Sequence, residues 1–212
     1  MTTSVILVRH GQTAWNAAEV FRGQIDIELD ETGLKQAELL AEYLSHRKLA
    51  AVYSSPLKRA VQTAEAIARH HRLIVEIAPG LNDMDFGEWQ GLSLQEVRTR
   101  SSELFEIWVS DPRQVRIPSG ESLHDVHQRA LALVNQVVKK HEDKAVALVS
   151  HRVVNKVLIC ALLGLDDSHF WNVRLDTCGM TTFEFDDGQF VLTEHNNTSF
   201  LEPLRQDRLR DF

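Results

Sequence analysis

Short apolar runs alternate with longer amphipathic stretches along most of this chain. The apolar runs predict buried strands, at residues 5–8, 50–54, 73–77 and 145–149. Between them, apolar residues recur at helical spacing and predict helices over residues 31–44, 57–68, 93–109, 122–141 and 153–163. Strands that alternate with helices in this way are typical of a three-layer α/β/α fold with a mostly parallel central sheet.

The pattern changes in two places. Residues 180–185 and 189–194 flank Asp187-Gly188 and predict a β-hairpin. Residues 91–120 end in a loop with proline and glycine, and we interpret them as a small helical insertion, or lid, above the sheet. Without repeats or a convincing linker, residues 1–195 are expected to form a single domain, and residues 196–212 a polar, loosely held tail.

Composition narrows the classes of function. The chain has 212 residues, 43% of them hydrophobic and 25% charged, as in a soluble globular protein. The net charge of -7 argues against general nucleic-acid binding, and no apolar run is long enough for a membrane span. With no signal peptide, and with Cys160 and Cys178 outside any metal or redox spacing, we expect a cytoplasmic protein with reduced thiols.

The end of the first strand carries Arg9 and His10 side by side. A neutral imidazole can attack phosphorus, and the planar fork of an arginine matches phosphate oxygens. Asn16 can add a neutral donor. A buried structural histidine beside a surface arginine is the competing interpretation, and for His10 taken alone it is the favoured one.

Two later segments end at the same edge of the predicted sheet. Arg59 lies in the first turn of the helix after strand 50–54, and His151 and Arg152 follow strand 145–149. The carboxyl ends of parallel strands meet at one edge, so these side chains are expected to surround a single tetrahedral anion. A protonated His151 would stabilise the charge on a transferring phosphoryl group.

A leaving alkoxide needs a proton, and the loop after strand 73–77 offers three acids for this role. They are Asp83, Asp85 and Glu88, next to residues that can shape a pocket, Phe86, Gly87 and Trp89. An acidic loop exposed to water is the competing interpretation.

Taken together, these segments resemble the histidine phosphatase superfamily, on its phosphoglycerate mutase-like branch and of the broad-specificity phosphatase type. The run Leu-Val-Arg-His-Gly-Gln-Thr-Ala-Trp-Asn is highly specific, and residues 23–26, 54–64, 86–91, 120–122 and 149–151 follow in family order. The resemblance covers roughly residues 4 to 195. It implies a phosphoglycerate mutase-like fold and a metal-independent phosphatase that hydrolyses small-molecule phosphomonoesters through a phosphohistidine.

The resemblance also implies roles for single residues. His10 would take the phosphoryl group, and Asp83, three residues before Phe86, would be the acid. Phosphate and substrate would be bound by Arg9, Arg59, His151, Asn16, Gly23, Gln24 and Arg152. No metal and no cofactor is implied.

Two residues depart from the family pattern. Asp83 stands where this branch usually has a glutamate, so a shorter side chain must reach the leaving group, and Asp85 and Glu88 stay open as alternatives. Arg152 stands where the residue after the second histidine is usually glycine. Arg152 either points at a second anionic group on the substrate or pairs with a surface acid.

Two rival functions remain at this point. A phosphoglycerate mutase would use the same phosphate ligands, but the mutases of this family carry a longer insertion before the second histidine. A binding module without turnover ranks last, because every expected phosphate ligand is present. The sequence names neither the substrate nor the oligomeric state, and a homodimer stays open.

Overall fold

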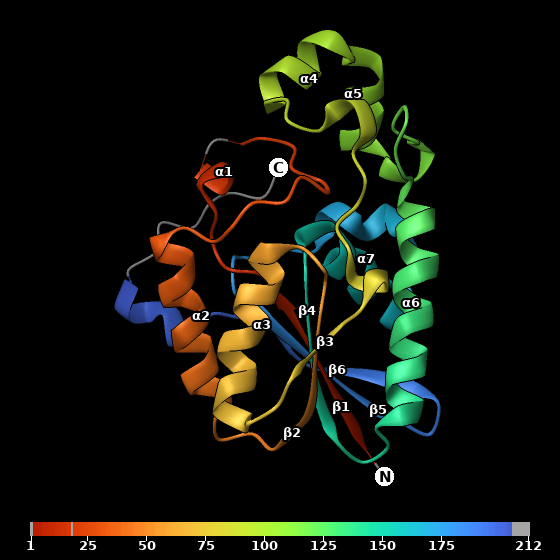
Figure 1. The fold of residues 1–212 in the computed structure, drawn as a ribbon. Helices are drawn as coiled ribbons and strands as arrows, with labels where there is room; N and C mark the ends of the chain where they lie inside the picture. The colour runs from red at the N-terminus through yellow and green to blue at the C-terminus, as the bar shows by residue number, and fades with distance from the viewer. Residues whose placement is uncertain (1, 18, 205–212) are drawn as a thin grey trace.

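A computed structural model of the chain describes residues 2–17 and 19–204. Its centre is a six-stranded sheet in the order β3-β2-β4-β1-β5-β6 (Figure 1). The first four strands in this order run parallel, and the β5–β6 hairpin adds two antiparallel strands at one edge. The strands are β1 (Thr3–Arg9), β2 (Leu49–Ser54), β3 (Val75–Ile77), β4 (Ala145–Ser150), β5 (Met180–Asp186) and β6 (Gln189–Asn197).

Helices cover both faces of the sheet. α2 (Glu31–Leu44) and α3 (Lys58–His71) pack on one face, and α6 (Leu123–Lys140) and α7 (Arg152–Leu162) on the other (Figure 1). Alternate residues of a strand point to opposite faces, so Val5 and Leu7 enter the core under α6 and α7. Ile6 and Val8 enter the core under α2 and α3. The predicted α/β/α architecture is confirmed.

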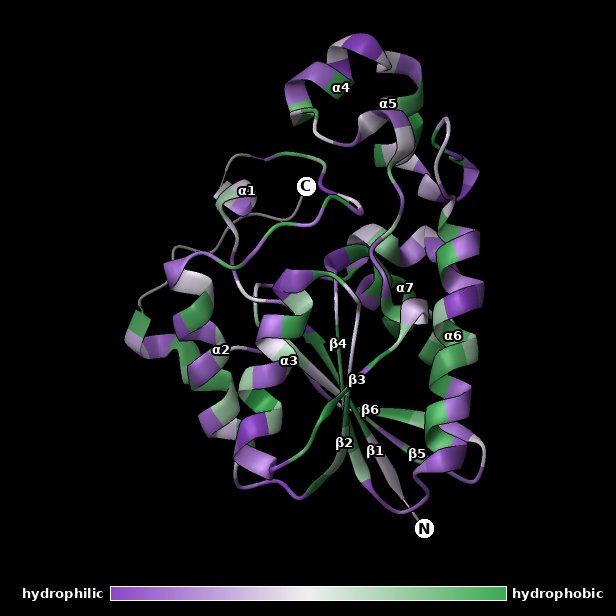
Figure 2. Cartoon of the chain, in the orientation of Figure 1, coloured by the Kyte–Doolittle hydropathy of each residue, from purple (hydrophilic) through white to green (hydrophobic). Residues whose placement is uncertain are grey.

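Hydropathy follows these layers. The central strands β1, β2 and β4 are hydrophobic along most of their length, whereas the helices are hydrophobic on one side and hydrophilic on the other (Figure 2). A parallel sheet is buried on both faces, which explains why its strands appear in the sequence as continuous apolar runs.

The insertion projects beyond the edge of the sheet at which β1 and β4 end (Figure 1). It contains α4 (Leu94–Arg100) and α5 (Ser102–Ser110), followed by a 3-10 helix, η3 (Pro112–Gln114). Residues 93–109 are broadly helical, as predicted, but they form two helices and not one. Ser101 adopts φ -134 and ψ 45, outside the helical region, and this residue breaks the run in two.

Two further differences concern short segments. α1 (Ala14–Ala17) was not predicted, because four residues are too few to show a helical period. The prediction of a loosely held segment from residue 196 is wrong as far as residue 204. A 3-10 helix, η5 (Ser199–Leu204), places Leu201 in the core under α2 and α3. The rest of the predicted tail, residues 205–212, lies outside the described residues. Within the described part of the chain, no helix has the length and apolar character that crossing a bilayer requires.

Candidate active site

His10 lies where β1 ends, and its ring is 1% exposed. Its Nδ1 lies 2.7 Å from the carbonyl oxygen of Gly11. A carbonyl can only accept a hydrogen bond, so Nδ1 carries the proton and Nε2 keeps a free electron pair. Burial, and then the nearby positive charges of Arg59, Arg22 and Arg9, hold the pKa of His10 well below its usual range. His10 is therefore a neutral imidazole with an available nucleophilic nitrogen.

His151 follows β4 and lies beside His10, with 5.2 Å between the ring centroids. Arg59 Nε donates to His151 Nδ1 at 3.2 Å, so the remaining proton of the ring is on Nε2, which donates to Ser55 Oγ at 2.7 Å. Burial, and then the charge of Arg59, lower the pKa of His151 well below its usual value. His151 is therefore a neutral imidazole, and the sequence hypothesis, in which a protonated His151 stabilises the transferring phosphoryl group, requires the ring to gain a proton during the reaction.

Arg59 hydrogen-bonds to the second histidine, to the candidate acid and to the loop that carries Gly23. It is fully buried in the first turn of α3. Its NH2 donates to the Gly23 carbonyl at 2.7 Å and to Asp83 Oδ2 at 3.0 Å, and its NH1 donates to the Ile25 carbonyl at 2.8 Å. These bonds fix the plane of the guanidinium relative to both the acid and the second histidine.

Asp83 is the acid that faces the site. Its Oδ2 accepts from Arg59, and its Oδ1 accepts from the backbone N–H of Met84 at 3.0 Å. Asp83 lines the cavity, whereas neither Asp85 nor Glu88 does. Asp85 Oδ1 accepts from the Gly87 backbone N–H at 2.8 Å instead, and Glu88 is exposed. Of the three candidates, Asp83 is therefore the one that faces the cavity.

Arg129 on α6 holds the loop that carries Asp83, and the sequence interpretation missed it. Its guanidinium donates to the carbonyls of Gly80, Asn82 and Asp83 at 3.0, 2.7 and 3.1 Å. Glu121 pairs with it at 2.9 Å. The available signal in the sequence was Glu121, eight positions before Arg129 and next to the start of a helix. An acid at that spacing does not reveal which loop the arginine contacts.

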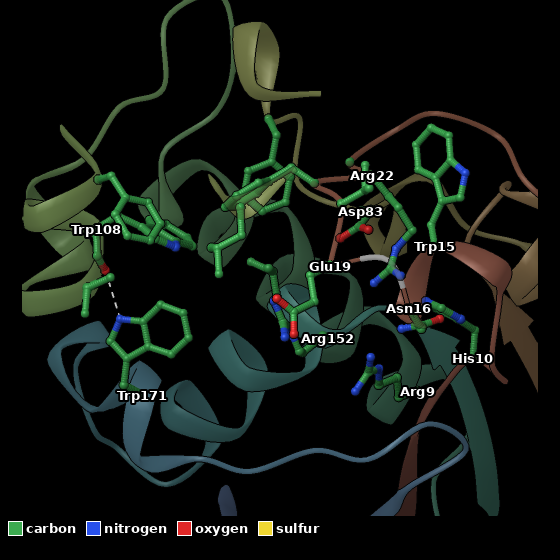
Figure 3. Close-up of a pocket in the computed structure, with 18 residues that line it drawn as sticks. Arg9, His10, Trp15, Asn16, Glu19, Arg22, Asp83, Trp108, Arg152 and Trp171 are labelled. Atoms are coloured by element: carbon green, nitrogen blue, oxygen red, sulfur yellow. Dashed lines mark hydrogen bonds between the residues drawn. The ribbon is translucent and has the colours of Figure 1, made fainter. Parts of the chain in front are cut away.

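The cavity has a polar end and an aromatic end (Figure 3). At the polar end, His10, Asn16 and Asp83 lie near one another, and Arg9 and Arg22 reach into the same region. At the other end lie Trp108 and Trp171, joined by a hydrogen bond of 2.8 Å from Trp171 Nε1 to the Trp108 carbonyl. Arg152 lies between the two ends, and Phe86 and Phe105 also line the cavity. Arg59 and His151 do not line it but lie behind Asp83 and His10.

The other predicted ligands have distinct positions. Arg9 lines the cavity and donates to the Leu175 carbonyl. Asn16 lines it too, and its Oδ1 accepts from Thr13 at 2.9 Å. Gly23 lines the cavity with φ +51, and a Cβ there would come within 2.2 Å of Gln90 Oε1. Only a glycine therefore fits without a shift of Gln90.

The structure corrects the predicted role of Gln24. The sequence interpretation counted it as a substrate ligand, but its side chain does not line the cavity. Its Nε2 donates to the backbone carbonyl of Asp83 at 3.2 Å, and its backbone N–H donates to Gln90 Oε1 at 2.6 Å. Gln24, in the turn at residues 23–24, therefore supports the loop that carries Asp83 from outside the cavity.

Arg22 is a cavity residue that no sequence motif singled out. Its Nε is buried and has no hydrogen-bond partner among the described residues. Burial, and then the charges of Arg9 and Arg152, lower the pKa of Arg22 well below its usual value. An anion placed among these guanidinium groups would relieve their mutual repulsion.

A positive cavity that faces a neutral imidazole suits a phosphate dianion that is to be attacked. Within residues 2–17 and 19–204, no group of three or more His, Cys, Asp or Glu side chains is arranged to hold a metal ion. Arginine side chains supply positive charge at the site.

Comparison with known proteins identifies the family of this chain. The histidine phosphatase superfamily (branch 1) matches residues 5–198. The chain belongs to this superfamily. It is 38% identical over 197 residues to phosphoserine phosphatase 1 of Hydrogenobacter thermophilus, with 93% of each chain covered. It is 39% identical to a metal-independent phosphoserine phosphatase of Arabidopsis thaliana, over 70% of this chain and 64% of that protein.

Solved structures show the same fold. YhfR of Bacillus stearothermophilus superposes with a TM-score of 0.90 at 31% identity, over 94% of this chain and 99% of that one. The resemblance read from the sequence, the phosphoglycerate mutase-like fold and the phosphatase class are confirmed. This histidine phosphatase is a phosphoric monoester hydrolase.

Proposed function

We propose that this histidine phosphatase hydrolyses small-molecule phosphomonoesters in the cytoplasm by passing the phosphoryl group through Nε2 of His10. The tautomer of His10 carries the proposal: its Nδ1 proton is held by the Gly11 carbonyl, so the opposite nitrogen is free to attack. The pKa of His10, which burial and Arg59 lower, keeps that nitrogen unprotonated in neutral solution.

In the first half-reaction, Nε2 of His10 forms a bond to phosphorus while the bond from phosphorus to the ester oxygen breaks. Protonated Asp83 gives its proton to the departing oxygen, and an alcohol leaves. A phosphate dianion beside Asp83 favours the protonated carboxyl, because two negative charges in one cavity repel each other.

In the second half-reaction, the Asp83 carboxylate takes a proton from water as its oxygen attacks phosphorus. The bond from phosphorus to Nε2 breaks, and inorganic phosphate and neutral His10 are restored. Atoms and charges balance, and Asp83 ends the cycle protonated, as it began.

Arginines supply the positive charge that the transition state needs. Arg9 and Arg22 line the cavity, and Asn16 adds an amide there. Arg59 acts from behind, through Asp83 and His151. As negative charge builds up on the phosphoryl oxygens, it favours protonation of His151, whose ring lies 5.2 Å from that of His10.

We propose that residues 1–195, together with residues 196–204, whose Leu201 packs into the core, act as one catalytic domain and that residues 91–120 serve as its lid. Trp108 of α5 supports this role, because it contacts Phe86, which follows Asp83 in the same loop, and Trp171 at the aromatic end of the cavity. A lid of this kind keeps water other than the attacking molecule away from the phosphohistidine.

The decisive experiment follows the phosphoryl group. His10→Ala should abolish hydrolysis of p-nitrophenyl phosphate, and wild-type protein quenched during turnover should carry phosphate on residue 10. His124→Ala, an exposed histidine outside the cavity, is the matched control and should keep full activity. A chelator should leave the rate unchanged. Retained activity in His10→Ala would refute the mechanism, and isomerisation of phosphoglycerates with a bisphosphate primer would favour the mutase alternative.

A further inference from the structure

Gln36 is a polar residue on the buried side of α2. Its side chain is 0% exposed, and all other buried residues of this helix are glycine, alanine or leucine. Its Nε2 is buried and has no hydrogen-bond partner among the described residues. A buried amide with an unpaired donor costs stability, so an apolar side chain would suit this position better unless the oxygen of the amide has a role.

The oxygen of Gln36 contacts the peptide group beside His10. Oε1 accepts a hydrogen bond from the backbone N–H of Gln12 at 2.8 Å. The same peptide group carries the carbonyl of Gly11, whose oxygen lies 2.7 Å from Nδ1 of His10. A trans peptide group is planar, and its N–H and C=O point in opposite directions. The bond to Gln36 at one end therefore fixes the direction of the acceptor at the other end.

From this arrangement we propose that Gln36 is a positioning residue for the nucleophile. By holding the peptide group between Gly11 and Gln12, it keeps the proton of His10 on Nδ1 and leaves the electron pair of Nε2 free for the phosphoryl group. Gln36 does not line the cavity, so it acts through this peptide group and not on the substrate. The inference deepens the proposed function and rests on it, because the tautomer of His10 matters for catalysis only if this ring attacks phosphorus.

The neighbouring backbone is held closely as well. Gly11 and Gly33 approach so closely that a Cβ on Gly11 would lie 2.6 Å from the carbonyl oxygen of Gly33, in the first turn of α2. The backbone N–H of Gly11 donates to Thr63 Oγ1 on α3 at 3.1 Å. These contacts fix the segment on both sides of the peptide group. Hydrogen bonds in a chain also polarise one another, so the bond from Gln12 to Gln36 makes the Gly11 carbonyl a better acceptor for His10.

Two substitutions of Gln36 test this role. Gln36→Met keeps the length of the side chain and removes the oxygen. Formation of phosphohistidine from p-nitrophenyl phosphate, followed by rapid quench, should slow by about 10-fold, the range of one hydrogen bond, with a smaller change in KM. NMR of the imidazole nitrogens should show His10 with its proton on Nε2 in a measurable share of the molecules.

Gln36→Glu returns an oxygen to the same place and should recover most of the rate and the Nδ1 tautomer, because burial raises the pKa of a carboxyl group and keeps it neutral. If Gln36→Met does not fold, Gln36→Asn withdraws the oxygen by one methylene and carries the same expectation. The rate is measured per site that becomes phosphorylated, so a fraction of unfolded protein lowers the amplitude and not the rate.

Gln62→Met is the matched control. It removes an equivalent bond, from the backbone N–H of Leu29 to Gln62 Oε1 at 2.8 Å, without contact to the peptide group beside His10. It should keep the wild-type rate and tautomer. A wild-type rate or a wild-type tautomer without the Gln36 oxygen, or equal slowing in Gln62→Met, would overturn the inference. Phosphate captured on His10 of the wild type would still support the proposed function in each of these cases, and its absence would refute that function separately.

Discussion

Nε of Arg59 lies 3.2 Å from Nδ1 of His151, and this contact determines which nitrogen of the second histidine carries the proton. An arginine can only donate, so Nδ1 must accept, and the proton is on Nε2 toward Ser55. The same guanidinium donates to Asp83 at 3.0 Å. One buried arginine therefore fixes both the orientation of the acid and the tautomer of the imidazole.

The first prediction concerns this arginine. Arg59→Met should raise the pKa of both His10 and His151, because burial and then the Arg59 charge lower the pKa of each. Titration of the imidazole nitrogens by NMR measures both values, and Arg98→Met, in the insertion, serves as the control. Unchanged pKa values of both rings in Arg59→Met would show that the charge of Arg59 does not affect their protonation.

The second prediction tests Asp83 through the leaving group. Asp83→Asn should slow hydrolysis of glycerol 1-phosphate by about 100-fold or more, the typical contribution of a general acid. Release of p-nitrophenol needs no proton, so p-nitrophenyl phosphate should give a rapid burst followed by slow turnover, since the second half-reaction still lacks its base. Asp85→Asn, outside the cavity, should behave like the wild type. Equal losses with both substrates and no burst would argue against proton donation by Asp83.

The third prediction separates positioning from chemistry. Arg129→Met should lower kcat more than it changes KM, because the carbonyls of Gly80, Asn82 and Asp83 lose their donors. The loss should be larger for alkyl than for aryl phosphates, as in Asp83→Asn, and the fold should lose about 1–3 kcal/mol of stability. Arg116→Met removes an exposed ion pair of the same helix start and is the control. An equal loss of activity with alkyl and aryl phosphates would indicate that Arg129 has a purely structural role.

The fourth prediction concerns stability against pH. The pKa values of folded His10 and His151 lie well below 6.5, chiefly because the rings are buried, so the unfolded chain binds more protons in mildly acidic solution. The free energy of unfolding should therefore fall as the pH drops below about 6.5, by about 1.4 kcal/mol per pH unit for each of these histidines.

Chemical denaturation in phosphate-free buffer between about pH 7.5 and about pH 5.5 measures this slope. His151→Gln removes one titrating group and should make the slope shallower by the share of one histidine. A slope identical to that of the wild type would show that His151 is not held neutral in the folded state.

Much of the architecture follows from local patterns. The helix over residues 31–44 has the predicted bounds, because its apolar period is regular and Asp30 caps its start. The meeting of His10 and His151 follows from strand order, since parallel neighbours such as β1 and β4 end at one edge. The break at Ser101 between α4 and α5 does not show in the apolar pattern, which continues across it at helical spacing.

The sequence by itself determined the α/β/α fold and the segments that meet at the site, because burial periodicity and strand direction are properties of short stretches and their order. Only the tertiary structure showed that Asp83, and neither Asp85 nor Glu88, lines the cavity, brought Arg22 into it, placed Arg129 against the loop that carries Asp83, and left His151 neutral. Those outcomes depend on burial and on distances between charges from distant segments, and no local pattern encodes them.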